Sequence, residues 1–129
     1  MFWLPLYRLT TEIGTPLIRG VVRKRLERGR EDPERVAERY GEPSRERPAG
    51  KLLWLHGASV GEAMSVLPLI AALKERWPQV TILMTTGTVT SAKLMAERLP
   101  EGVIHQFVPL DRLSWVRRFF DHWRPDAAL

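Results

Sequence analysis

The sequence predicts an α/β domain built on a Rossmann-like parallel sheet. Short apolar runs alternate along the chain with segments in which apolar residues recur at helical spacing. The apolar runs are almost uninterrupted, which is typical of strands covered on both faces. The length of 129 residues suits one domain. The absence of cysteine excludes a disulfide-stapled fold and a zinc site with cysteine ligands.

The predicted strands and helices follow one another from residue 51 onward. The strands are, in chain order, residues 52–55, 80–84, 103–108 and 126–129. The helices are residues 62–76, 91–99 and 113–123. Pro68 predicts a kink in the first helix, and Asp111 is placed to cap the last one. Because the sequence stops inside the fourth strand, we expect this domain to be the amino-terminal part of a longer protein.

Residues 1–30 contain the whole positive excess of the chain, whose net charge is +5. They hold seven basic and two acidic side chains, whereas the other 99 residues hold thirteen of each. Charges divide the apolar residues of this segment into runs much shorter than the ~20 residues that span a bilayer. No small-residue cleavage site of a signal peptide follows them. The pattern therefore predicts a local anion-binding segment near the amino terminus.

Residues 1–30 also have an amphipathic pattern. Apolar residues recur at spacings of three and four, at Leu6, Leu9, Ile13, Leu17 and Val21. Proline and glycine interrupt this pattern and predict a broken helix, with breaks at Pro5, Gly14, Pro16 and Gly20. We expect the segment to lie on a membrane surface. Its expected membrane contacts are Phe2 and Trp3 in the acyl boundary, and Arg23, Lys24 and Arg25 on anionic headgroups.

Two other interpretations of residues 1–30 remain open. In the first, the apolar stripe packs against the protein's own core and the cations form a solvated face. In the second, the cations bind nucleic acid, which the charge alone would favour. No aromatic side chains are interleaved with the cations to stack on bases. We therefore expect no nucleic-acid partner.

Residues 31–50 differ in composition from the segments on either side. They are rich in proline, glycine and charged residues. Asp32 and Pro33 supply a capping residue and a first helical residue for a short helix over residues 33–40. We therefore predict a linker with one short helix, which joins the amino-terminal segment to a domain over residues 51–129.

A loop of small residues follows the first predicted strand, at residues 56–62 (HGASVGE). Ligands of open parallel sheets bind at the carboxyl ends of the strands, and glycines allow a close approach to the backbone. Glu62 is a candidate general base. The alternative is that Ser59 and Glu62 form a capping box at the start of the next helix. His56 is either a ligand contact or a strand-end histidine bonded to the neighbouring backbone.

A second candidate loop follows the second strand, at residues 85–91 (TTGTVTS). Its hydroxyl groups suit a sugar or a phosphate. The alternative is that Thr88, Thr90 or Ser91 only caps the following helix. The sequence has neither the phosphate loop of NTPases nor the glycine pattern of dinucleotide-binding enzymes. Its three histidines are scattered, so no metal site is predicted.

These motifs, in this order, resemble the 3-deoxy-D-manno-octulosonic acid (Kdo) transferases. The resemblance rests chiefly on residues 54–62 (WLHGASVGE), 67–70 (LPLI) and 85–88 (TTGT). Further matching segments are residues 29–33, 38–41, 108–111 and 124–126. The resemblance implies the amino-terminal half of a two-domain GT-B glycosyltransferase. It also implies a protein at the cytoplasmic face of the bacterial inner membrane. Because charges interrupt the first segment more than they would interrupt a spanning anchor, we expect a peripheral or monotopic attachment.

The resemblance further implies a reaction, in which Kdo passes from CMP-Kdo to a lipid A precursor with inversion and without a metal or other cofactor. Glu62 matches the glutamate that acts as catalytic base in the family. Contacts with the acceptor are expected among His56, Ser59, Gly61, Thr85, Thr86 and Thr88. The CMP part of the donor is expected to bind a carboxyl-terminal domain that this sequence lacks, so the chain alone is expected to be inactive. The alternative function is a non-catalytic peripheral membrane-binding α/β module.

Overall fold

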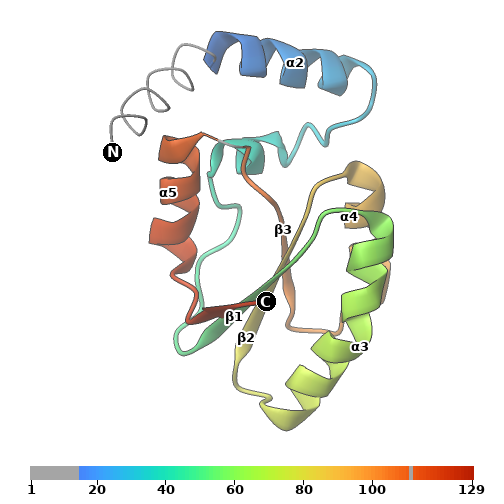
Figure 1. Cartoon of the computed structure of the whole chain (residues 1–129), viewed down its shortest axis with the longest axis vertical. Coiled ribbons are helices and arrows are strands. Elements are labelled where there is room, and N and C mark those ends of the chain that lie inside the picture. The colour runs from blue at the N-terminus through green and yellow to red at the C-terminus, as the bar shows by residue number, and fades with distance from the viewer. Residues whose placement is uncertain (1–14, 111) are drawn as a thin grey trace, which may run out of the picture.

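The protein is described from a computed structural model, which describes residues 15–110 and 112–129. Its centre is a sheet of four parallel strands (Figure 1). The strands are β1 (Leu52–Gly57), β2 (Thr81–Thr86), β3 (Ile104–Phe107) and β4 (Ala127–Ala128). They lie in the order β3-β2-β1-β4. This order is that of the first four strands of a Rossmann sheet, which confirms the predicted fold class.

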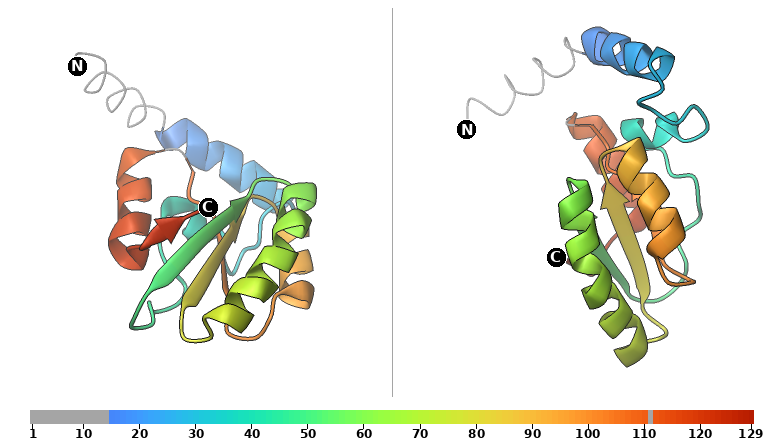
Figure 2. Two further views of the ribbon diagram at one scale, coloured as in Figure 1. Left: turned by 60° about the horizontal axis from the view of Figure 1, so that its bottom comes forward. Right: turned by 90° about the vertical axis from the view of Figure 1, so that its right-hand side faces the viewer.

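Helices cover both faces of the sheet. The three that follow strands are α3 (Val60–Arg76), α4 (Val89–Arg98) and α5 (Leu113–Trp123). α3 and α4 lie together on one side and α5 lies on the other (Figures 1 and 2). Leu55 and Ile82 pack under α3 and α4, whereas Leu52 and Leu83 pack under α5. Successive strand residues point to opposite faces, so the consecutive apolar residues of β1 and β2 contribute to the cores on both sides of the sheet.

The carboxyl ends of β1 and β2 extend further than the sequence predicts, whereas β3 and β4 are shorter than the predicted strands at residues 103–108 and 126–129. β1 continues to Gly57 and β2 continues to Thr86, with His56 paired to Thr85 and Gly57 paired to Thr86. The threonines were expected in a loop, because hydroxyl side chains at a strand end resemble a turn in sequence. α3 runs through Pro68. Arg112 occupies the N-cap position of α5, and Asp111, the expected cap, lies outside the described residues.

Two further elements lie beyond the carboxyl ends of the strands. They are the helix α2 (Thr15–Glu27) and the 3-10 helix η1 (Val36–Tyr40). α2 crosses above this end of the fold (Figure 1). It runs without a break through Pro16 and Gly20, so the prediction of breaks at these two residues was wrong. Proline is tolerated in a first turn because the N–H groups there have no partner within the helix. Pro5 and Gly14 lie outside the described residues.

Candidate functional site

The loops after β1 and β2 meet at the carboxyl edge of the sheet. Gly57 allows this arrangement, because a Cβ atom on it would lie 2.8 Å from the backbone of Ala63. Gly87 lies close to the other loop, since a Cβ atom on it would be 3.5 Å from the carbonyl oxygen of Ala58. The sheet edge thus brings the two loops predicted from the sequence side by side. α3 begins directly at the end of β1.

Glu62 lies in the first turn of α3 and is exposed. Its backbone N–H donates to the Ser59 hydroxyl at 3.2 Å. Its carboxylate Oε2 accepts a hydrogen bond from the backbone N–H of Ala58 at 2.8 Å. The expected capping role is therefore present, with Ser59 as N-cap. Because Oε1 has no hydrogen-bond partner among the described residues, the side chain is both positioned and free to accept a proton.

His56 is also exposed, at the end of β1. Its Nδ1 lies 2.9 Å from the hydroxyl of Thr85. The indole N–H of Trp54 donates to the same hydroxyl at 2.9 Å. A Thr85 hydroxyl that accepts from Trp54 and donates to Nδ1 leaves Nε2 as the ring nitrogen that a ligand can reach. His56 therefore remains a candidate contact beside Glu62.

Thr85 and Thr86 have no exposed surface. The hydroxyl of Thr85 binds Trp54 and His56, and that of Thr86 lies 2.8 Å from Nε2 of His105. Both hydroxyls are therefore occupied within the fold. We correct their expected role from ligand contact to positioning of the two histidines. The strand pairing places the two histidines beside these threonines. The burial of the threonines could not be predicted, because hydroxyl residues at a strand end resemble a loop in the sequence.

Thr88 is the N-cap residue of α4 and forms a capping box with Ser91. The Thr88 hydroxyl accepts from the Ser91 backbone N–H at 3.1 Å. This confirms the capping alternative for the second loop. Ser59 and Gly61 are exposed beside Glu62. Of the expected acceptor contacts, His56, Ser59 and Gly61 therefore lie with Glu62 on one open rim.

A buried network of charged side chains lies on the other side of this edge, and the sequence did not predict it. Arg39 and Glu31 are both buried and pair at 3.1 Å. The Arg39 guanidinium also donates to the carbonyl oxygen of Gly87 and lies over the Phe107 ring, 4.6 Å from its centre. Arg39 thus ties η1 to the loop after β2. This pairing fixes the position of a loop that adjoins Ala58 and hence Glu62.

The same network reaches β3 through a second ion pair. Arg35 pairs with Glu38 at 2.9 Å and donates to the carbonyl oxygen of His105 at 3.0 Å. Glu38 accepts from the backbone N–H of Phe107 at 2.8 Å. Burial, with the nearby charges of Arg35 and Arg39, lowers the pKa of His105 from 6.5 to about 3. His105 is therefore neutral at physiological pH and serves as a hydrogen-bonded core residue.

This network belongs to the segment that the sequence describes as a linker. A proline-rich stretch with many charged residues resembles a solvent-exposed linker. The burial of Glu31, Glu38 and Arg39 therefore could not be predicted from a periodic pattern in the sequence. The sequence feature that pointed to this segment was the family resemblance, because residues 29–33 and 38–41 are among the matching segments. No group of three histidine, aspartate or glutamate side chains within residues 15–110 and 112–129 is arranged to hold a metal ion.

α2 packs on this edge through one side only. Val22 is buried, and the Arg19 guanidinium lies 4.3 Å from the centre of the Tyr40 ring. Leu17 and Val21 are 76% and 58% exposed. For these two residues the interpretation that the apolar stripe packs on the core is therefore wrong. No helix in the described part of the chain is both long and apolar enough to cross a membrane.

The expected headgroup contacts divide into two kinds. Arg23 and Lys24 are exposed and have no ion-pair partner among the described residues. Arg25 is half-buried and pairs with Glu31 at 3.0 Å, so we correct its role from free headgroup contact to an anchor of α2. Its burial depends on a long-range pairing that helical spacing does not reveal. Phe2 and Trp3 lie outside the described residues.

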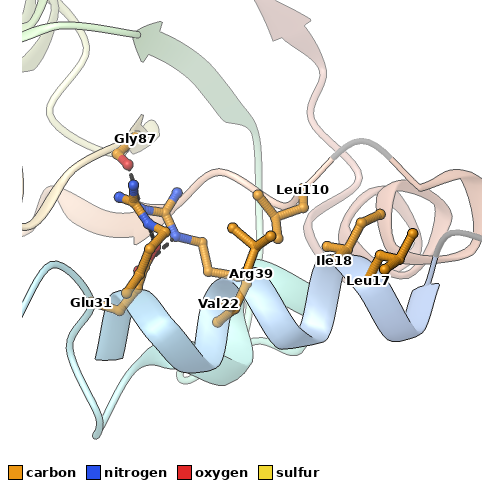
Figure 3. Close-up of a pocket in the computed structure, with 9 residues that line it drawn as sticks. Leu17, Ile18, Val22, Glu31, Arg39, Gly87 and Leu110 are labelled. Atoms are coloured by element: carbon orange, nitrogen blue, oxygen red, sulfur yellow. Dashed lines mark hydrogen bonds and ion pairs between the residues drawn. The ribbon is translucent and has the colours of Figure 1, made fainter. Parts of the chain in front are cut away.

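Two cavities lie under and beside α2. The first has a volume of about 370 Å³ and is lined chiefly by apolar side chains of α2 and by Leu110. Figure 3 shows α2 on one side of it, with Leu110 and Arg39 on the other. The second has a volume of about 630 Å³ and lies between the end of α2 and the start of α4. Arg25 lines both cavities, and Glu62 lines neither.

Comparisons with known proteins agree with one another. Residues 34–129 match a family model described as 3-deoxy-D-manno-octulosonic-acid transferase (kdotransferase). The chain is 43% identical over 129 residues to a probable mitochondrial 3-deoxy-D-manno-octulosonic acid transferase of Arabidopsis thaliana, covering 100% of this chain and 29% of the relative. It is 33% identical over 124 residues to the 3-deoxy-D-manno-octulosonic acid transferase of Rickettsia bellii, covering 96% of this chain and 30% of the relative. The chain thus spans less than a third of the length of these relatives. No solved structure matches it.

Proposed function

Since the chain belongs to the 3-deoxy-D-manno-octulosonic acid (Kdo) transferase family, we propose that it is the amino-terminal, acceptor-binding domain of a glycosyltransferase. The reaction transfers Kdo from CMP-Kdo to a lipid A precursor, with inversion at the anomeric carbon and without a metal ion. The CMP group binds a second, carboxyl-terminal domain. The 129-residue chain is therefore inactive by itself. Its part in the reaction is to hold the acceptor and to supply the base.

Glu62 is the base in this proposal. Its carboxylate takes the proton of an acceptor hydroxyl, the hydroxyl oxygen forms the new bond to the anomeric carbon of Kdo, and CMP leaves with the electrons of the broken bond. The supporting observation is the placement of Glu62, exposed at the sheet edge with Oε2 bonded to Ala58. His56, Ser59 and Gly61 adjoin it and contact the acceptor sugar.

The reaction is tested with a full-length protein that contains this domain. We expect mass spectrometry to detect a product in which Kdo is joined to the lipid A precursor. The anomeric configuration of the transferred Kdo, determined by NMR, should be opposite to that in CMP-Kdo. The isolated 129-residue chain, incubated with the same substrates, should give no product. Retention of the anomeric configuration would contradict the inverting mechanism. Product formed by the isolated chain would contradict the proposed division of labour between two domains.

We also propose that this domain attaches peripherally to the cytoplasmic face of the bacterial inner membrane. The support is α2, whose exposed residues include the apolar Leu17 and Val21 and, in the following turn, the cationic Arg23 and Lys24. Apolar and cationic side chains in this order suit an interfacial helix on anionic lipid. Each cation contributes about 1 kcal/mol near such a surface. The acceptor is itself a membrane lipid, so attachment keeps Glu62 near its substrate.

Vesicle sedimentation tests the attachment. We expect Arg23→Gln/Lys24→Gln to weaken binding to vesicles containing phosphatidylglycerol by roughly tenfold or more. A matched control, Arg98→Gln/Arg117→Gln, removes the same charge from exposed positions on α4 and α5. Equal losses in the two variants would show that net charge alone attracts the chain to vesicles, which would contradict attachment through α2.

A further inference from the structure

The two cavities beside α2 differ in the side chains that line them. The apolar cavity adjoins the first half of the helix and is lined by Leu17, Ile18, Val21 and Val22. The second cavity adjoins the end of the helix and is lined by Arg25 and Arg30, with Lys93 and Thr90 of α4 and its N-cap Thr88 opposite. Arg25 lines both cavities. The two cavities therefore follow one another along α2, apolar first and cationic second.

The cations of the second cavity are available for a ligand. Arg30 and Lys93 are both exposed, and neither has an ion-pair partner among residues 15–110 and 112–129. Only Arg25 has a carboxylate partner, Glu31, and that carboxylate also neutralises Arg39. The cavity thus has an unbalanced positive charge. Such a site favours an anion, and guanidinium groups suit the oxygens of a phosphate.

The apolar cavity suits a different part of the same ligand. Its volume of about 370 Å³ is within the range of small-molecule sites. Leu17 at its rim is exposed, so an apolar chain can enter from the surface of α2. A molecule that fills both cavities has to be apolar at one end and anionic at the other. A phospholipid with its acyl chain beside Leu17 and its phosphate beside Arg30 meets this requirement.

We infer that the domain holds one anionic phospholipid of the bilayer lengthwise along α2, with an acyl chain in the apolar cavity and the phosphate between Arg30 and Lys93. This inference rests on the proposed attachment to membranes and adds a defined binding site to it. The site is separate from the one where the acceptor reacts, because Glu62 lines neither cavity. The bound lipid orients the sheet edge toward the membrane while the acceptor hydroxyl approaches Glu62.

The test uses the 129-residue chain and a soluble probe, dihexanoyl phosphatidic acid below its micelle concentration. We expect saturable binding by calorimetry, with roughly tenfold to thirtyfold weaker affinity in Arg30→Gln/Lys93→Gln, since each cation acts on the phosphate. The matched control is Arg23→Gln/Lys24→Gln, which removes two charges from the same helix outside both cavities. We expect this control to bind the probe within about twofold of the unmodified chain. If both double variants lose the same affinity for the probe, the proposed phosphate site is wrong.

Three further measurements separate the occupants. Leu17→Ser should weaken binding of the lipid probe and leave binding of inorganic phosphate unchanged, which supports a site with an apolar part. If inorganic phosphate binds as tightly as the lipid probe, the acyl chain does not contribute to the affinity. The site would then be a phosphate site, which would overturn the inference. Competitive inhibition of Kdo transfer by the probe in the full-length enzyme would identify the occupant as the acceptor and also overturn it. If Arg23→Gln/Lys24→Gln no longer binds vesicles but still binds the probe, the lipid site is independent of the general attraction of the chain to membranes.

Discussion

Two groups of charged side chains lie at the carboxyl edge of one sheet and are built in opposite ways. On the β3 side, Glu31, Arg39 and Glu38 are buried, and each carboxylate accepts more than one hydrogen bond. On the β1 side, Glu62 is exposed and accepts one hydrogen bond from the backbone. The first group has its charges matched by partners in the fold. The second has a carboxylate oxygen that no described residue occupies.

This difference distinguishes carboxylates that stabilise the fold from carboxylates that can take part in a reaction. A buried carboxylate with a partner on each oxygen is expensive to disturb and has no unbonded oxygen to offer a substrate. An exposed one held by a single backbone N–H contributes little to stability and can still exchange a proton. We therefore expect substitutions in the buried group to change the free energy of unfolding, and those at Glu62 to change the rate.

The largest effect on stability is expected from Arg39→Met. It removes the buried one of the two arginines that pair with Glu31, together with the hydrogen bond to Gly87. Removal of one member of a buried ion pair costs about 3–5 kcal/mol. Urea unfolding followed by tryptophan fluorescence measures this loss. The control is Arg118→Met, which breaks an exposed pair with Glu42 and should cost less than about 1 kcal/mol. Similar losses in both variants would contradict the distinction between buried and exposed pairs.

A second effect is expected from Gly57→Ala, at the junction of β1 and α3. The new Cβ atom would lie 2.8 Å from backbone atoms of Ala63, so α3 has to move away from the strand. Overpacking of this kind costs about 1–3 kcal/mol. The rate should fall as well, because Glu62 moves with the helix. Gly61→Ala is the matched control, since the nearest atom to its Cβ is Ser59 Oγ at 3.9 Å. Equal stability of the two variants would show that the close approach is not a constraint.

A smaller effect concerns pH. The pKa of His105 is lowered from 6.5 to about 3, so between these values the unfolded chain binds a proton that the folded chain does not. The contribution of neutral His105 to the free energy of unfolding is therefore fully present above about pH 6.5. The free energy of unfolding decreases as the pH falls toward 3, by about 1–2 kcal/mol at pH 5. His105→Gln should lose this part of the dependence. Urea titrations from pH 7 to pH 5 compare the two proteins. Parallel curves would exclude His105 as the source.

Much of the fold could be predicted from the sequence, because each strand and helix has its own apolar pattern. The helix over residues 113–123 was predicted with the bounds that the structure gives it. Strand ends were less certain. Thr85 and Thr86 are polar, so only their pairing with β1 and their contacts with histidines show that they belong to a strand.

The exposed part of the site was easier to predict than the buried part. The loop at residues 56–62 follows an apolar strand and precedes a helix, so its place at the sheet edge follows from local sequence. Glu31 and Arg39 pair within the predicted linker, and Glu38 accepts from the backbone of Phe107 in β3, which is 69 residues away in the sequence. No local pattern distinguishes such residues from a solvated linker. Only the tertiary arrangement shows that they are buried.

The most direct test of the account compares Kdo transfer by full-length Glu62→Gln and Ser59→Ala. Glutamine keeps an oxygen for the Ala58 N–H but cannot take a proton, whereas Ser59→Ala removes the helix cap and keeps the carboxylate. We predict that Glu62→Gln lowers kcat by about 10²–10⁴-fold with a free energy of unfolding within about 1 kcal/mol of the unmodified protein. Ser59→Ala should lose about 1 kcal/mol of stability and less than tenfold in kcat. Transfer by folded Glu62→Gln at a near-normal rate would contradict the assignment of Glu62 as the base.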